Sequence, residues 1–303
     1  MSAYRIVGGG SLGLLLAGKL AAAGFEVTVV TRSAEQASKL SEDGITLEDV
    51  VTGLPSVTAN VRAVSWEDAP ETDGLTLLTV KQTALTPEFV GRIADIVPVG
   101  GEVVLFQNGI GHAEKLRAAL PGRMIMPAVT TEGARRVGPT TVRHTGRGDT
   151  RIGVSGLLER SLEQAGFSVI LSNKLESDIM RKLLTNAVIN PLTALLRVKN
   201  GQLPATRERL ELMRSLFDET FDIVQACGFT EERATAWQSV LDVCENTKHN
   251  ESSMLQDVAA GRETEIEAIN GSVCRLGAEL GRRTPWNETV TALVKATYTG
   301  KGD

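Results

Sequence analysis

Apolar and polar positions follow two different patterns along this chain, and the change falls near residue 172. Before it, short apolar runs alternate with segments of helical periodicity. The runs predicted as strands are residues 5–8, 26–31, 75–80, 102–106, 124–129 and 168–171, and the helix candidates between them are 11–23, 34–40, 87–96 and 113–120. This alternation predicts βαβ units and a doubly wound, mostly parallel Rossmann-like sheet with helices on both faces.

Beyond this point strand patterns disappear and helical periodicity dominates. The predicted helices are residues 175–189, 207–227, 231–246, 264–280 and 285–297. We therefore expect a Rossmann-like domain at 1–172 and an all-helical domain at 173–303. Residues 140–153, where apolar and polar positions alternate, are interpreted as a hairpin added late in the first domain. Ligands of such proteins often bind between domains and at the carboxyl ends of the strands.

Composition agrees with a globular chain of two domains. The 303 residues are 42% hydrophobic and 23% charged, and the net charge is −5 from 32 basic and 37 acidic residues. Neither half is strongly basic, which argues against nucleic acid as a partner. Apolar stretches fall short of the roughly 20 residues that span a bilayer, so no membrane partner is expected. Three scattered cysteines and no leader-like N-terminus indicate a cytoplasmic protein.

A glycine-rich segment follows the first predicted strand and opens the first predicted helix. Its sequence, Gly8-Gly9-Gly10-Ser11-Leu12-Gly13, matches G-x-G-x-x-G in the context that makes this pattern specific. Gly8 suits a tight turn, Gly10 leaves room for a pyrophosphate, and Gly13 lets helix and strand pack closely. The helix N-terminus offers N–H groups and a positive dipole end to phosphates. We expect a bound dinucleotide here; the alternative is a glycine-rich turn without a ligand.

The residue after the second predicted strand indicates which dinucleotide is preferred. NAD sites usually carry Asp or Glu there for the ribose hydroxyls, whereas Arg suits a 2′-phosphate. Thr31-Arg32-Ser33 provides one cation, two hydroxyls and no acid. We predict NADPH as the cofactor, with Arg32 binding its 2′-phosphate. The alternative is a surface arginine beside an NAD site.

Polar residues also follow two neighbouring strands of the predicted sheet. Lys81 follows the strand at 75–80, and Gln107-Asn108-Gly109 follows the strand at 102–106. The carboxyl ends of parallel strands form the edge where such sheets bind ligands. We therefore expect Lys81, Gln107 and Asn108 to line the cofactor site, although strand ends are often polar in any protein.

A polar stripe is predicted on the first helix of the second domain. Lys182, Asn186 and Asn190 are spaced four residues apart among apolar neighbours, which puts all three on one helix face. Such a stripe requires polar partners. The alternative is a face exposed to solvent. Pro191 is expected to end or kink this helix, because proline disfavours helical geometry in the residue before it.

Acidic and histidine side chains give weaker signals. Glu265 lies beside an apolar position and shares a helix face with Ile269, so it is a candidate site carboxylate. The alternative is an acid placed at a helix N-terminus by the helix dipole. His112, His144 and His249 have no recognisable acidic partner in a motif, so we expect none of them to be catalytic. No pair of residues has metal-ligand spacing, and no metal is expected.

The chain resembles the 2-dehydropantoate 2-reductase (ketopantoate reductase) family over nearly its whole length. Besides the glycine loop, the matching segments are Val80-Lys81, Gln107-Asn108-Gly109, Arg181-Lys182-Leu183 with Asn186, Asn190-Pro191-Leu192-Thr193-Ala194, Asn200-Gly201, Ser252-Ser253-Met254-Leu255-Gln256-Asp257 and Thr264-Glu265-Ile266. The Asn-Pro-Leu-Thr-Ala and Ser-Ser-Met-Leu-Gln-Asp segments are highly specific. Two details depart from the family: Gln107 stands where histidine often precedes Asn-Gly, and Val198-Lys199 is unfamiliar before Asn200.

The resemblance implies a cytoplasmic enzyme that uses NADPH to reduce the ketone of ketopantoate to D-pantoate in pantothenate biosynthesis. It implies that Lys182 is the general acid and that Glu265 supports substrate binding and catalysis. It places Lys81 and Asn108 where cofactor meets substrate, and Arg32 on the 2′-phosphate. The remaining substrate contacts that it implies are Asn186, Asn190, Asn200, Asn250 and Ser253.

Two other functions stay open at this stage. One is the same NADPH-dependent reaction on another branched 2-oxo acid. The other is a non-enzymatic NADPH-binding regulator, which would have no need to keep both Lys182 and Glu265. In either enzymatic case the partner is a small 2-oxo acid, and we expect a monomer or a homodimer.

Overall fold

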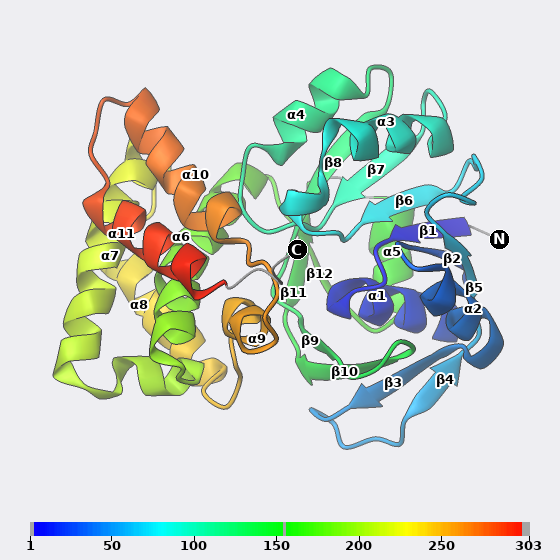
Figure 1. The fold of residues 1–303 in the computed structure, drawn as a ribbon, viewed down its shortest axis with the longest axis horizontal. Helices are drawn as coiled ribbons and strands as arrows, with labels where there is room; N and C mark the ends of the chain where they lie inside the picture. Colours follow the sequence, from blue (N-terminus) through cyan, green and yellow to red (C-terminus); the bar gives the residue numbers. More distant parts are fainter. Residues whose placement is uncertain (1–2, 154–155, 299–303) are drawn as a thin grey trace. The chain divides into compact units, whose positions relative to one another are not determined.

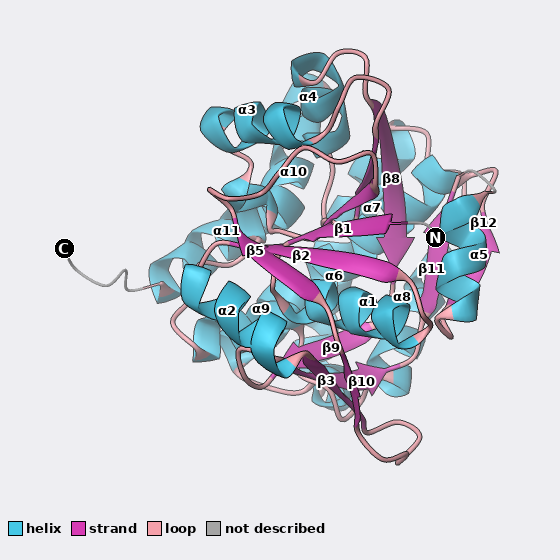
Figure 2. Cartoon of the chain, turned by 90° about the vertical axis from the view of Figure 1, so that its right-hand side faces the viewer, coloured by secondary structure: helices cyan, strands magenta, loops and turns pink. Residues whose placement is uncertain are grey.

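Buried strands with apolar residues on both faces form the centre of the N-terminal part of the chain. The computed structural model describes residues 3–153 and 156–298 and separates into two units, one within Met1–Gln107 and His112–Leu175 and the other within Asn108–Gly111 and Glu176–Asp303. The first unit contains an eight-stranded and a four-stranded sheet, and the second is built from helices (Figure 1; Figure 2).

The larger sheet has the order β12-β11-β8-β7-β6-β1-β2-β5. Its strands are β1 (Ala3–Val7), β2 (Glu26–Thr31), β5 (Arg62–Ser65), β6 (Leu75–Leu78), β7 (Glu102–Leu105), β8 (Met124–Thr130), β11 (Asp149–Ile152) and β12 (Ser168–Leu171). Every neighbouring pair is parallel except β8 and β11. The predicted fold class, a mostly parallel Rossmann-like sheet followed by helices, is confirmed.

Successive residues of the central strands supply two separate cores. On β1, Ile6 packs into the cluster that includes α1 (Ser11–Ala22) and α5 (Leu157–Gln164), while Val7 packs into the cluster with α3 (Pro87–Ile96) and α4 (His112–Ala119). Burying one such side chain contributes roughly 1.5–3 kcal/mol. The central strands are therefore mainly apolar, as expected of a sheet covered on both faces, and the buried Arg5 of β1 donates a hydrogen bond to the Ile96 carbonyl at 2.6 Å. A short 3₁₀ turn, Gln82–Ala84, follows β6.

The smaller sheet corrects one prediction. Its order is β4 (Val57–Ala59), β3 (Ile45–Asp49), β10 (Thr141–Gly146) and β9 (Gly133–Arg136), and α2 (Ala34–Asp43) precedes β3. The hairpin expected at 140–153 is wrong, because β10 pairs with β3 and β9 whereas β11 pairs with β8 and β12 in the larger sheet. Alternation identifies a half-buried strand, but it does not identify the partner strand.

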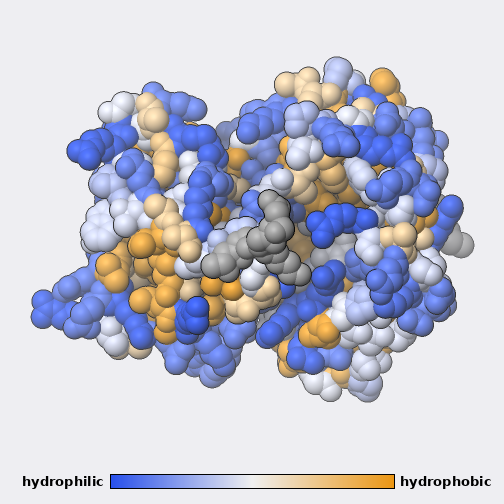
Figure 3. All heavy atoms as spheres, viewed as in Figure 1, coloured by the Kyte–Doolittle hydropathy of each residue, from blue (hydrophilic) through white to orange (hydrophobic). Residues whose placement is uncertain are grey.

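The second unit packs its helices around one apolar core. After α6 (Leu175–Leu196) and a 3₁₀ segment (Asn200–Ala205) come α7 (Arg207–Ala226), α8 (Arg233–Asn246), α9 (Ser253–Ala259), α10 (Ile266–Glu279) and α11 (Pro285–Thr297). Phe217, Phe221 and Phe229 are among its largest fully buried side chains. Figure 3 shows apolar side chains grouped on the visible face of this unit. Within residues 3–153 and 156–298, no helix is long and apolar enough to cross a membrane.

Pro191 does not end α6, so the first of the two outcomes expected of this proline is wrong. The helix continues from Leu175 through Pro191 to Leu196. Proline lacks the N–H that an α-helix needs for its hydrogen bond to the carbonyl four residues earlier, which is Ala187. That carbonyl instead accepts a hydrogen bond from the buried side chain of Asn270, at 2.9 Å. A contact from another helix therefore overrides the local preference.

Candidate active site

The glycine loop has the geometry that dinucleotide binding requires. It joins β1 to α1, and Gly8 has φ +124°, a conformation that favours glycine. A Cβ at Gly13 would lie 1.9 Å from the Gly8 carbonyl oxygen, so only glycine fits there. A Cβ at Gly10 would meet no atom within 4 Å. The loop is therefore closely packed at Gly13 and open at Gly10, beside the N-terminus of α1.

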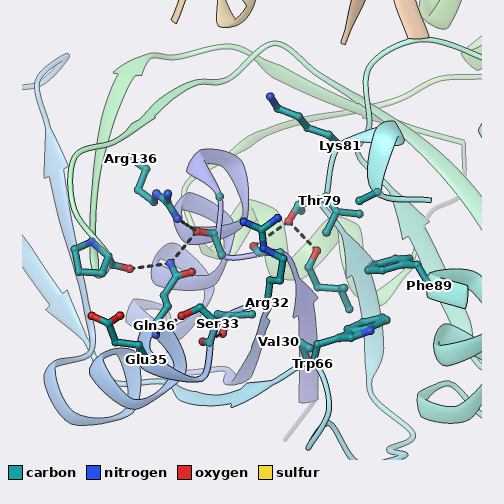
Figure 4. Close-up of a pocket in the computed structure, with 18 of the residues that line it drawn as sticks. Val30, Arg32, Ser33, Glu35, Gln36, Trp66, Thr79, Lys81, Phe89 and Arg136 are labelled. Carbon is teal, nitrogen blue, oxygen red and sulfur yellow. Dashed lines mark hydrogen bonds between the residues drawn. The ribbon is translucent and has the colours of Figure 1, made fainter. Parts of the chain in front are cut away.

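A cavity of about 1160 Å³ opens on this loop within the first unit (Figure 4). Clefts for drug-sized ligands hold roughly 300–1,000 Å³, so this one has room for a larger molecule. Among the predicted cofactor residues, those that line it are Gly8, Gly9, Gly10, Arg32 and Lys81. Arg32 is exposed directly after β2, at the rim that the sequence indicated. The cavity therefore brings the glycine loop and both predicted cations together.

Arg136 is a cavity residue that the sequence analysis missed. It lies at the end of β9, and its Nη1 donates a hydrogen bond to the Gly9 carbonyl at 3.0 Å. Its backbone N–H donates to Ser11 Oγ, also at 3.0 Å. Gln36 Nε2 lies 2.9 Å from the Gly9 carbonyl, and Figure 4 shows both side chains directed at the loop. The only sequence signal was a pair of adjacent arginines, 135 and 136.

Two aromatic rings form another part of the cavity lining. Trp66 and Phe89 are stacked with their centroids 4.2 Å apart and an interplanar angle of 4°. Figure 4 shows them side by side below Lys81. A flat apolar surface of this kind is suited to an aromatic base. Neither ring was singled out from the sequence.

Five predicted cofactor residues do not line this cavity: Ser11, Leu12, Gly13, Gln107 and Asn108. The first three lie in the loop and the first turn of α1. Gln107 is buried, and its amide oxygen and nitrogen have no hydrogen-bond partner in the part of the chain that the structure describes. Asn108 belongs to the helical unit.

In the helical unit, Asn108, Lys182 and Glu265 form one polar cluster. Asn108 Nδ2 donates a hydrogen bond to Glu265 Oε2 at 2.9 Å. Glu265 is 8% exposed and precedes the first residue of α10. Burial lowers the pKa of Lys182 from 10.5 to about 8, and the Glu265 carboxylate acts in the opposite direction. The structure therefore joins a lysine of perturbed pKa to a buried carboxylate, a combination found at functional sites.

The polar stripe of α6 is not a solvent-exposed face. Asn190 is 6% exposed, and Lys182 and Asn186 are half-buried. Beyond Pro191 the helix runs on to Leu196, and Thr193 Oγ1 lies 2.7 Å from the Ile189 carbonyl oxygen. The three stripe residues all precede Pro191 and lie on one helix, as their spacing predicted.

Asn200 and Asn250, two further predicted substrate residues, lie together. The Asn200 backbone N–H donates to the Asn250 carbonyl at 3.0 Å, and its side-chain Nδ2 donates to Thr247 Oγ1 at 2.8 Å. Asn200 Oδ1 is buried, and no residue that the structure describes pairs with it. Ser253 is exposed at the start of α9, whereas Ser252 is buried and lies 2.7 Å from Thr193.

Two of the histidines, His112 and His144, have side-chain partners, and those of His144 are carboxylates that the sequence did not reveal. His144 Nε2 lies 2.5 Å from Glu132 Oε2, and both side chains are buried. His112 Nδ1 lies 2.8 Å from Gln82 Nε2. Across residues 3–153 and 156–298, no group of three or more His, Cys, Asp or Glu could hold a metal ion.

A Rossmann-like domain with a dinucleotide-type loop, followed by a helical domain carrying a lysine–carboxylate cluster, defines a class of two-domain oxidoreductases. The family model "Ketopantoate reductase PanE/ApbA" matches residues 4–156, and its C-terminal counterpart matches 174–298. The chain belongs to the ketopantoate reductase family of oxidoreductases.

Individual relatives extend over the whole chain. It is 34% identical to a 2-dehydropantoate 2-reductase of Archaeoglobus fulgidus, covering 98% of each chain. It is 36% identical to the Bacillus subtilis protein of that name, covering 88% of this chain and 87% of the relative. A ketopantoate reductase structure from Ralstonia eutropha JMP134 superposes with a TM-score of 0.88 at 28% identity, covering 98% of each chain. D-mandelate dehydrogenase shares the fold, with a TM-score of 0.89 at 24% identity over 98% of each chain.

Proposed function

We propose that this protein is an NADPH-dependent 2-dehydropantoate 2-reductase, which reduces the ketone of ketopantoate to D-pantoate in pantothenate biosynthesis. The observation that carries the proposal is the cluster of Asn108, Lys182 and Glu265 in a chain that also holds a dinucleotide-type cavity. Full-length relatives at 34% and 36% identity bear this name. A cytoplasmic location and a monomeric or homodimeric state belong to the same proposal.

NADPH is the proposed occupant of the cavity in the first unit. Arg32, exposed after β2, is assigned to the 2′-phosphate, because guanidinium groups bind phosphate oxygens in pairs. Arg136, which contacts Gly9, is assigned to the diphosphate. Trp66 and Phe89 offer a stacking surface for adenine. Open space in front of Gly10 and the N-terminus of α1 supports this placement of the phosphates.

The helical unit is the proposed binding site for the oxo acid. Ketopantoate presents a carboxylate, a ketone and a hydroxyl, and amide side chains can pair with all three. We assign Asn186, Asn190, Asn200, Asn250 and Ser253 to these oxygens. Asn200 supports the assignment, because its Oδ1 is a buried acceptor that a substrate hydroxyl would satisfy.

Lys182 is the proposed general acid. Bound NADPH would supply the hydride that reduces the carbonyl carbon. The Lys182 ammonium group stabilises the negative charge that develops on the ketone oxygen and then transfers its proton to that oxygen. With a pKa of about 8, Lys182 is mostly protonated at neutral pH yet releases its proton more readily than an ordinary lysine.

Glu265 has two proposed roles beside this lysine. Its carboxylate favours the protonated form of Lys182. The same carboxylate is proposed to accept a hydrogen bond from the substrate hydroxyl. Asn108 Nδ2 donates to Oε2 of this carboxylate at 2.9 Å. Asn108 therefore orients Glu265 rather than only occupying a strand end.

The direct test is NADPH oxidation by the purified protein with ketopantoate, followed by chiral analysis of the product. The proposal predicts that one D-pantoate forms for each NADPH consumed. Absence of ketopantoate-dependent oxidation, with NADPH bound, would contradict the assigned activity. The molar mass from light scattering under the same conditions distinguishes monomer from homodimer.

A further inference from the structure

Pro191 leaves a gap in the hydrogen bonding of α6, the helix that carries Lys182, Asn186 and Asn190. In a regular helix residue 191 would donate to the carbonyl of Ala187, but proline has no N–H. Ala187 is fully buried, so water cannot readily fill the gap. A buried carbonyl without a partner would destabilise this part of the helix.

Asn270 fills this gap from α10. Its side chain is 0% exposed, and its Nδ2 donates to the Ala187 carbonyl at 2.9 Å. The second N–H of the same amide donates to Asn287 Oδ1, also at 2.9 Å. Both neighbours are acceptors, so the amide nitrogen must face them.

A carboxylate on α7 fixes this orientation. Glu219 Oε1 accepts from Asn287 Nδ2 at 2.9 Å and from the Asn287 backbone N–H at 2.8 Å. Because a carboxylate only accepts, the Asn287 amide must turn its oxygen toward Asn270. These bonds link four helices, because Asn270 on α10 donates to α6 and α11, and Asn287 on α11 donates to α7. Asn287 Nδ2 also donates to Thr220 Oγ1 on α7 at 3.1 Å, so more than one bond joins α11 to α7.

We propose that Asn270 is a positioning residue for the reaction: it replaces the missing Pro191 N–H and thereby fixes the helix of Lys182 against the helix that begins after Glu265. Glu265 and Asn270 lie at opposite ends of the first turn and a half of α10. The Asn270 bond reaches α6 one residue beyond Asn186. The bond therefore sets the spacing between the general acid and its carboxylate. This role rests on the proposed function of Lys182 and Glu265.

The test is a double-mutant cycle of Asn270→Ala and Pro191→Ala in the full chain. Asn270→Ala leaves the Ala187 carbonyl unpaired and should lower the midpoint of thermal unfolding by roughly 2–10 °C. It should also lower kcat/KM for ketopantoate by about 10- to 100-fold through misplacement of Lys182, with the Kd for NADPH unchanged. Adding Pro191→Ala restores a backbone N–H at this carbonyl and should recover most of both losses.

Ser272→Ala is the matched control. Ser272 is buried on the same helix, but its hydroxyl donates within α10, to the Ala268 carbonyl at 2.8 Å. If Ser272→Ala lowers the midpoint of thermal unfolding or kcat/KM, adding Pro191→Ala should not restore either quantity.

The inference would be overturned if the effects of Asn270→Ala and Pro191→Ala are additive. It would also be overturned if Asn270→Ala weakens NADPH binding by as large a factor as it lowers kcat/KM. If Asn270→Ala does not fold alone, a folded double variant supports the inference and an unfolded one contradicts it. The thermal cycle remains decisive even if wild-type protein fails to reduce ketopantoate, so failure of the function and failure of this inference are distinguishable.

Discussion

Asn108 and Glu265 are 157 residues apart in sequence, yet the Asn108 amide donates a 2.9 Å hydrogen bond to the Glu265 carboxylate. Asn108 follows a strand of the Rossmann-like sheet but belongs to the helical unit with Gly109–Gly111. A short segment from the N-terminal half of the chain therefore contributes Asn108 to the candidate acid–base cluster. The charge of Glu265 and the proton of Lys182 are coupled in this cluster.

Neutralising Glu265 should change the pH dependence of the reaction. Burial lowers the pKa of Lys182 from 10.5 to about 8, and the Glu265 carboxylate raises it against that effect. A general acid must be protonated, so kcat/KM should fall as pH rises through about 8. Glu265→Gln removes the raising charge, so this decline should move to lower pH. Glu263→Gln, an exposed neighbour, serves as the control. An unmoved profile would contradict the coupling.

Removing the general acid should affect the chemical step more than binding. Lys182→Ala is expected to lower kcat by about 10²–10⁴, because the lysine acts mainly on charge that develops in the transition state. NADPH affinity, measured by fluorescence titration, should survive, since the glycine loop and Arg32 are in the other unit. Lys115→Ala on α4 is an exposed control. More than about a tenth of wild-type kcat in Lys182→Ala would exclude this role.

Arg32 and Arg136 should differ in their effect on cofactor choice. Arg32→Ala should weaken NADPH binding by about 10- to 150-fold and leave NADH nearly unchanged, because only NADPH carries the 2′-phosphate. Arg136→Ala should weaken both cofactors by a similar factor, because Arg136 contacts Gly9 at the diphosphate loop. Arg135→Ala, on the adjacent position of β9, is the control. A non-selective Arg32 variant would refute the 2′-phosphate assignment.

The stacked pair of Trp66 and Phe89 provides a spectroscopic test of the adenine position. Binding of adenosine 2′,5′-bisphosphate should quench tryptophan fluorescence, and Trp66→Leu should abolish the quench and weaken binding by about tenfold. Trp286→Leu, exposed on α11 of the helical unit, should retain the quench. Quenching that persists in Trp66→Leu would place the base elsewhere.

The sequence was sufficient for the parts of the fold that depend on local pattern. Strands β1, β2, β6 and β7 are short apolar runs buried on both faces, and they were recognised. Strands β3, β4, β5 and β9 were missed, because they are short and carry many polar residues. The end of α6 was misjudged, since the donor that replaces the Pro191 N–H comes from Asn270 on a distant helix.

The candidate site shows the same division. The glycine loop and Arg32 follow from residue types at fixed positions around a strand and a helix. Arg136, Trp66 and Phe89 reach the cavity only through tertiary packing, and no spacing relates them to Gly9. The pairing of Asn108 with Glu265 likewise needed the fold. The roles of the predicted substrate residues stay predictions.

The most direct test of the central claim is a comparison of kcat/KM across 2-oxo acids with NADPH. Ketopantoate should exceed pyruvate by several orders of magnitude, because pyruvate lacks the hydroxyl and the gem-dimethyl group and leaves buried polar groups unpaired. Phenylglyoxylate, the oxo acid that corresponds to mandelate, tests whether the fold shared with D-mandelate dehydrogenase extends to substrate. A clear preference for ketopantoate is the result predicted here. Equal turnover of pyruvate, or a preference for phenylglyoxylate or another branched oxo acid, would contradict it.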